Sequence, residues 1–212
     1  MPKFVDNWRG AWRNRFFRDQ LLFSLIGLLL ALVLMRLFLA YVESRSGIGL
    51  PDPLLSLFAP VELKWITYSF IYSAIILGLV SLAPHPFSLL LVVRATFVLV
   101  LLRITFLFLL PLDPPPGCIP IVDPFIRIPA ISPTTSRDLF FSWHIALIAL
   151  FALSARFRDM KIIFSSAALV VSILFLLQHA HYTIDVVAAP CFAYVAHGVA
   201  KSSTMHNGPA KP

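Results

Sequence analysis

Six long apolar runs dominate the sequence, and each approaches the length of a helix that crosses a bilayer. A crossing helix needs roughly 20 mainly apolar residues, because each residue adds only about 1.5 Å to its length. The runs cover residues 21–42, 65–83, 87–110, 138–155, 162–178 and 182–200. They predict an all-α membrane protein with six transmembrane helices.

The composition agrees with a membrane protein. Hydrophobic residues make up 59% of the chain and charged residues 13%, with a mean hydropathy of +0.87. A soluble domain has too little interior to bury so much apolar surface. In a soluble chain, the net charge of +7 would suggest that the protein binds nucleic acid. Here the basic residues lie mainly between the apolar runs. We therefore expect a membrane environment and no nucleic-acid partner.

The segments around these runs are also informative. The first run is too long for a cleaved secretion signal, contains Arg36 and lacks a small-residue cleavage site, so it predicts an uncleaved span. The connection 111–137 is dense in proline, which predicts an extended rather than a helical chain. Residues 201–212 are predicted to form a disordered tail.

The distribution of Lys and Arg predicts the orientation, because cytoplasmic segments keep an excess of positive charge. Ten of these residues fall in 1–20, 156–161 and 201–212, all on one side of the predicted topology. The connections on the opposite side contain Arg45, Arg127 and Arg137, with Lys64 at a boundary. Both termini are therefore predicted to be cytoplasmic, with a basic segment 1–20, a transmembrane domain 21–200 and a cytoplasmic tail 201–212.

Ionisable residues gather where the fourth and sixth runs begin, both on the predicted non-cytoplasmic face. Such groups are costly next to hydrocarbon, so they usually face a protein interior and often mark a functional site. The fourth run opens with Asp138, Ser142 and His144. The sixth is preceded by His179 and His181 and opens with Tyr182, Thr183 and Asp185. We expect the two sets to form one shared site.

The spacing of His181 and Asp185 indicates a chemistry for this site. Residues four apart lie on one face of a helix, where a carboxylate can hold one imidazole nitrogen protonated and leave the other as a nucleophile or base. His144, from another helix, can then donate a proton to a leaving oxygen. This arrangement suits phosphoryl transfer through a phosphohistidine, although a purely structural His–Asp pair is the open alternative.

Phosphate chemistry also needs a cation. Arg103, near the outer end of the third run, can bind phosphate oxygens in a bidentate manner, and the alternative is that it extends to the membrane interface. Arg127 and Arg137 are alternatives in the loop. Cys118 and Cys191 show no metal-ligand spacing.

Three segments resemble the sphingomyelin synthase family, a branch of the type 2 phosphatidate phosphatase superfamily. The stretch HAHYTIDVV at 179–187 is similar to the last signature of that family, and DLFFSWH at 138–144 resembles its preceding Ser-Gly-His signature less closely. LLRITFLFLLPLDP at 101–114 is loosely similar to an earlier arginine-to-proline segment. The resemblance covers roughly residues 100 to 200.

The resemblance implies that a phosphocholine or phosphoethanolamine headgroup passes from a glycerophospholipid to ceramide or a related lipid alcohol, which releases diacylglycerol. It implies that His181 is the nucleophile or base, Asp185 its orienting partner and His144 the proton donor. Asp138 matches an acidic residue of the signature and is expected, with Arg103, Ser142 and Tyr182, to bind substrate. It implies neither a metal nor a cofactor, and homo-oligomerisation stays open.

One departure from the family concerns the middle of the Ser-Gly-His signature, where Trp143 replaces the glycine. Glycine lets the backbone approach a phosphate, whereas an indole ring narrows or redirects the pocket. This departure therefore bears on the identity of the substrate more than on the reaction class. Two alternatives remain: a lipid phosphatase or phospholipase C-type hydrolase that uses the same site, and a non-catalytic membrane scaffold in which Trp143 fills it.

Overall fold

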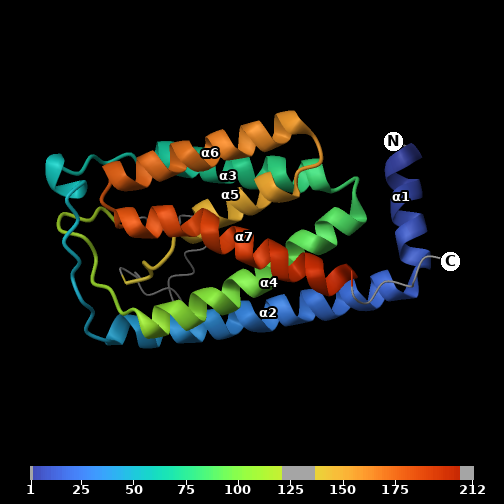
Figure 1. Cartoon of the computed structure of the whole chain (residues 1–212), viewed down its shortest axis with the longest axis horizontal. Helices are drawn as coiled ribbons and strands as arrows, with labels where there is room; N and C mark the ends of the chain where they lie inside the picture. Colours follow the sequence, from blue (N-terminus) through green and yellow to red (C-terminus); the bar gives the residue numbers. More distant parts are fainter. Residues whose placement is uncertain (1, 121–136, 206–212) are drawn as a thin grey trace.

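The computed structural model describes residues 2–120 and 137–205, and it is helical throughout its regular parts (Figure 1). The described residues contain no β-strand, only an isolated bridge between Ile48 and Leu112. The elements are α1 Pro2–Arg13, α2 Arg15–Ser44, the 3₁₀ turn η1 Leu55–Leu57, α3 Lys64–Leu82, α4 Pro86–Leu109, α5 Trp143–Ser154, α6 Arg158–Leu177 and α7 Thr183–Met205.

Five of these helices, α2, α3, α4, α6 and α7, are long and apolar enough to cross a membrane. Their outward sides carry many exposed large hydrophobic residues, such as Leu37 of α2 and Leu169 of α6. A water-soluble protein rarely exposes so much apolar surface, because its contact with water is unfavourable. The chain is therefore an integral, multi-pass membrane protein.

The bundle has two flanks and a centre (Figure 1). Helices α3 and α6 run together along one flank and α2 and α4 along the other, while α5 and α7 pack between them. We call the end that holds connections 45–63, 110–120 and 178–182 the loop end. The opposite end, which holds α1, the turns after α3 and α5, and the end of α7, is the terminal end (Figure 1).

Helix α5 is the central helix of the bundle and the shortest of α2 to α7. It has 12 residues, and six of them are buried: Ile145, Ala146, Ile148, Ala149, Leu150 and Phe151. Its close packing on α3 depends on Gly78, where an added Cβ would lie 2.7 Å from the Phe151 ring. Small residues permit such close helix contacts in membrane proteins.

The sequence prediction of a helix from residue 138 is wrong for its first turn. The helix begins only at Trp143, so at about 1.5 Å per residue it is about 18 Å long, short of a bilayer core of about 30 Å. The physical reason is that Arg103 binds the backbone carbonyls of Asp138, Phe140 and Phe141. The segment before α5 therefore stays non-helical, with a bend at Phe140 and Phe141.

The structure corrects two further boundaries. The predicted first span begins earlier, because α2 starts at Arg15, where the Asn14 side chain accepts a hydrogen bond from the Phe17 N–H and acts as its N-cap. The predicted disordered tail is instead helical as far as Met205, and Arg94 of α4 donates a hydrogen bond to Ser203 at 2.7 Å. Residues 206–212 lie outside the described part of the chain.

The proline-rich connection agrees with the prediction where it is described, since residues 110–120 contain no helix. Gly47 lets this connection pass close to the segment after α2, because an added Cβ there would lie 2.5 Å from the Asp113 backbone nitrogen. Residues 121–136, including Arg127, lie outside the described residues.

Candidate active site

The turn between α6 and α7 brings His181 to the inside of the loop end. Two backbone hydrogen bonds, from Ala180 N–H to Phe175 O and from His179 N–H to Leu176 O, form the Schellman motif that ends α6. Its left-handed position, usually a glycine, is occupied here by His179 with a φ of 52°. The buried His179 ring lies with Nδ1 2.9 Å from the Pro116 carbonyl oxygen, which helps to hold this unfavourable backbone conformation.

His181 and Asp185 lie next to each other, but not on one face of a helix as the sequence spacing predicted. Helix α7 begins only at Thr183, so His181 stands in the turn before it and Asp185 in its first turn. Asp185 Oδ2 accepts a hydrogen bond from the Tyr182 N–H at 3.0 Å and lies 3.4 Å from His181 Nδ1. The carboxylate thus serves as an N-terminal cap of α7 while it faces the imidazole.

His144 lies close to the same place, at the start of α5. The ring of Phe175 packs against both histidines, with ring centroids 5.9 Å from His144 and 5.1 Å from His181. The Ser142 N–H donates a hydrogen bond to the Asp185 carbonyl oxygen at 3.3 Å, which ties the start of α5 directly to the first turn of α7. The two sequence segments singled out for chemistry are therefore adjacent.

A cavity of about 270 Å³ opens beside the two histidines. Four residues singled out from the sequence line it: Arg103, Asp138, His144 and His181. Trp143 and Cys118 also line it, and one wall consists of apolar side chains of α2, Leu32, Met35 and Leu39. The cavity thus combines a polar end with a wall suited to hydrocarbon.

Arg103 lines this cavity, but its guanidinium is already bound. It is 3% exposed and forms an ion pair with Asp138 at 2.6 Å, in addition to its bonds to the backbone carbonyls before α5. These contacts use the fork geometry of arginine. The geometry supports a positioning role for Arg103, and the prediction that it binds phosphate stays untested.

Three other predicted site residues lie behind the cavity rather than in its lining. The Tyr182 hydroxyl donates to the Asp113 carbonyl at 2.9 Å and accepts from the Leu50 N–H at 3.2 Å, so it joins two connections at the loop end. Asp185 and Ser142 are fully buried, and the Ser142 hydroxyl has no hydrogen-bond partner among the described residues.

Arg137, the loop alternative for phosphate binding, is also engaged by protein groups. Its guanidinium donates to Asp113 Oδ1 and to the Glu43 carbonyl oxygen, both at 2.7 Å. It therefore joins the end of α2 to the connection after α4. Within residues 2–120 and 137–205, no cluster of three His, Cys, Asp or Glu residues has a geometry that holds a metal ion.

Sequence reasoning missed Asp52, which stabilises the start of α7 from the loop before α3. Its carboxylate accepts hydrogen bonds from the Thr183 N–H at 2.7 Å and the Thr183 hydroxyl at 3.0 Å. No local pattern reveals this contact, because the two residues are 131 positions apart. Burial acts to raise the pKa of Asp52, but hydrogen bonds from Thr183, Leu54 and Leu55 outweigh it and lower that pKa.

Asp52→Asn is expected to lower the stability of the loop end by about 1 kcal/mol, as the loss of a helix cap does. Since the folded-state pKa of Asp52 lies below its ordinary value of 3.8, the charge stabilises the fold above that pH and its contribution is lost as the pH falls through the lower folded value. Thermal unfolding in detergent between pH 3 and 7 measures this. The variant should show a lower unfolding temperature at pH 7 and a weaker acid dependence.

Glu62→Gln is the matched control for this prediction, since Glu62 is a carboxylate in the same connection that pairs with Lys64 and not with α7. An equal acid dependence in the wild type and Asp52→Asn would show that Asp52 does not stabilise α7.

The fold and the site together define a class: an integral α-helical membrane protein with a buried His–Asp pair beside a cavity. The chain has no match among known protein-family models, curated proteins or solved structures.

Proposed function

We propose that the protein is a lipid headgroup phosphotransferase, similar in reaction to the sphingomyelin synthase family that its sequence resembles. The observation that carries this proposal is that His144 and His181 line one cavity, with Asp185 behind His181 and an apolar wall from α2. A phospholipid would present a charged headgroup and two hydrocarbon chains to such a cavity. The site offers complementary surfaces for both parts.

In the proposed reaction, His181 Nε2 attacks the phosphorus of phosphatidylcholine or phosphatidylethanolamine. The bond between phosphorus and the diacylglycerol oxygen breaks, and His144 donates a proton to that oxygen. The hydroxyl of ceramide or a related lipid alcohol then attacks phosphorus, gives its proton to His144 and releases His181. Asp185, 3.4 Å from His181 Nδ1, stabilises the positive charge that forms on the ring.

Asp138 is the proposed partner of the headgroup amine. It lines the cavity, and its side chain is 28% exposed although one oxygen pairs with Arg103. A choline or ethanolamine cation is attracted to such a carboxylate. The Arg103–Asp138 pair thereby contributes both charge signs to a site for a zwitterionic headgroup.

The proposed topology has six crossings, with both termini in the cytoplasm and the site on the non-cytoplasmic face. The alternating direction of α2, α3, α4, α5, α6 and α7 supports it, and so does the cluster of basic residues at the terminal end (Figure 1). In this arrangement α5 and the non-helical segment 138–142 together make the fourth crossing. Because α5 is short, its first turn, which carries His144, lies below the non-cytoplasmic surface of the membrane.

The decisive experiment follows headgroup-labelled phosphatidylcholine and phosphatidylethanolamine in proteoliposomes, with and without ceramide or diacylglycerol. Label that moves into a new lipid would support transfer and identify the acceptor. Label released only into water would mean that the site is hydrolytic, the alternative in which water attacks the same intermediate. The absence of turnover with every donor would favour a scaffold.

A bell-shaped pH profile of turnover is expected between pH 5 and 9, because His181 must be unprotonated to attack while His144 must be protonated to donate. Initial rates over this range, with the wild type and His144→Gln, measure it. In the variant, the fall in rate at alkaline pH should disappear, because that fall reports the loss of the His144 proton. A flat wild-type profile would contradict the paired roles.

Trp143→Gly is expected to change substrate preference more than reaction type. Trp143 lines the cavity at the first position of α5, so removal of its ring enlarges the space beside the headgroup. We expect the ratio of kcat/KM for phosphatidylcholine over phosphatidylethanolamine to change by about tenfold, roughly 1.4 kcal/mol of differential binding. Trp143→Phe, which keeps an aromatic ring, is the control. An unchanged ratio in Trp143→Gly would show that Trp143 does not select the headgroup.

A further inference from the structure

Helix α1 lies across the terminal end of the bundle (Figure 1). Two side-chain hydrogen bonds hold it there: Trp8 Nε1 donates to the Ala83 carbonyl at 2.8 Å and Asn7 to the Pro84 carbonyl at 2.9 Å. The Trp8 ring also packs edge-on against Phe17 of α2, with centroids 6.3 Å apart. Helix α1 is therefore a docked element of the fold.

The sides of α1 differ sharply in chemistry. Ala11 and Trp8 face the bundle, while Phe4, Val5 and Trp12 are 42–49% exposed. A groove combines these apolar side chains with arginines of α1 and α2, and its lining is Phe4, Val5, Trp8, Arg9, Trp12, Arg13 and Arg18. It has no acidic member.

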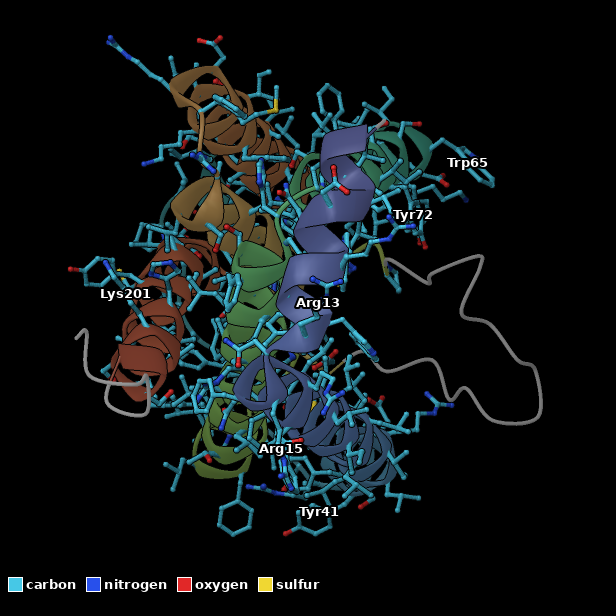
Figure 2. All side chains as sticks on the ribbon, turned by 90° about the vertical axis from the view of Figure 1, so that its right-hand side faces the viewer. Arg13, Arg15, Tyr41, Trp65, Tyr72 and Lys201 are labelled. Carbon is cyan, nitrogen blue, oxygen red and sulfur yellow. The ribbon has the colours of Figure 1, made fainter. Side chains whose placement is uncertain are left out.

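Within the described part of the chain, no ion pair involves the three arginines of this groove. The ion pairs there involve other residues, and the nearest joins Arg15 to Asp19 at 3.9 Å. Figure 2 looks onto this end of the bundle and labels three of its basic residues, Arg13 of the groove, Arg15 and Lys201. An anion that approaches this groove therefore meets uncompensated charge.

The five spanning helices place a membrane surface near each end of the bundle. Because α1 lies across the ends of these helices, it runs along that surface, where aromatic rings and arginines prefer the headgroup region (Figure 1). We propose that the groove of α1 binds anionic phospholipids of this leaflet, with phosphate on Arg9, Arg13 and Arg18 and acyl chains against Phe4, Val5 and Trp12. This inference does not depend on the proposed enzyme activity.

The test uses the full chain in phosphatidylcholine nanodiscs that contain brominated phosphatidylglycerol or, at equal mole fraction, brominated phosphatidylcholine. Bromine quenches nearby indoles, and subtraction of Trp12→Phe from the wild type isolates the signal of Trp12. We expect at least about twofold stronger quenching by the anionic lipid, since each arginine near an anionic surface is attracted by about 1 kcal/mol.

Two triple variants separate the groove from general charge at this end. Arg9→Gln, Arg13→Gln and Arg18→Gln together should abolish the preference for the anionic lipid. The matched control, Arg156→Gln, Arg158→Gln and Lys161→Gln, removes the same charge from the exposed turn and start of α6 at the terminal end and should keep the preference. The single variant Arg13→Gln should lose part of the preference for the anionic lipid. It replaces the triple groove variant in the test if that variant does not fold.

Three outcomes would overturn the inference. The wild type shows no preference for the brominated anionic lipid; both triple variants lose the preference equally, which means a diffuse charge effect; or the wild type shows no lipid preference but binds a polyglutamate peptide through the three groove arginines, which means a soluble acidic partner.

Discussion

Replacement of His181 by glutamine is expected to reduce headgroup transfer by at least about 10³-fold, because the nucleophile of the proposed reaction is lost. Glutamine keeps polarity and approximate size, so the 8% exposed position should not become a large void. Asp185→Asn should give a smaller loss, since His181 would remain without its oriented carboxylate. The rate of transfer between lipids and the amount of acid-labile phosphate trapped on the protein measure both effects.

His85→Gln is the matched control, because this histidine lies before α4 at the terminal end, away from the cavity. It should leave transfer unchanged. If His181→Gln inserts and unfolds like the wild type but keeps more than about a tenth of the activity, His181 is not the nucleophile.

Arg103→Gln is expected to destabilise the fold by about 3–5 kcal/mol, the usual cost when one partner of a buried ion pair is removed. Glutamine leaves Asp138 without its counter-charge and cannot hold the carbonyls of Asp138, Phe140 and Phe141 together. The non-helical segment before α5 should then shift, and with it His144. Arg103→Lys keeps the charge but lacks the planar guanidinium with its several N–H donors. It should therefore be more stable than Arg103→Gln and still lose most of its activity.

Thermal unfolding of the single variants and of the double variant Arg103→Gln, Asp138→Asn gives a double-mutant cycle. The double variant should be more stable than Arg103→Gln alone, since it removes the carboxylate that would have lost its counter-charge. Additive losses would contradict the coupling that we infer from the 2.6 Å contact.

The helices were predictable because their signals are local. Apolar runs near the length of a bilayer mark α2, α3, α4, α6 and α7, and the structure confirms five helices of this kind. The proximity of His181 and Asp185 was also predictable from their separation of four residues, although the helix that was expected to carry both begins two residues after His181. The contact survives because a turn brings residues four apart as close as a helix does.

The limits of α5 were not predictable from hydropathy, because the apolar residues Leu139, Phe140 and Phe141 continue the apolar run of the helix toward its N-terminal side. Arg103 decides their conformation, since its guanidinium binds the carbonyls that a helix would need. The same contacts mean that Arg103, expected to be available to phosphate, is already occupied by protein groups. A single sequence cannot show which partners satisfy an arginine.

The sequence alone determined that the chain is an α-helical membrane protein and which residues carry ionisable groups next to hydrocarbon. The length of an apolar run and the free-energy cost of placing an ionisable group in hydrocarbon are properties of each segment by itself. Only the tertiary structure decided that Phe175 packs against both His144 and His181, that Asp52 holds Thr183 from 131 residues away, and that α1 lies across the bundle. These contacts join distant segments, and their geometry depends on how the helices pack rather than on any local pattern.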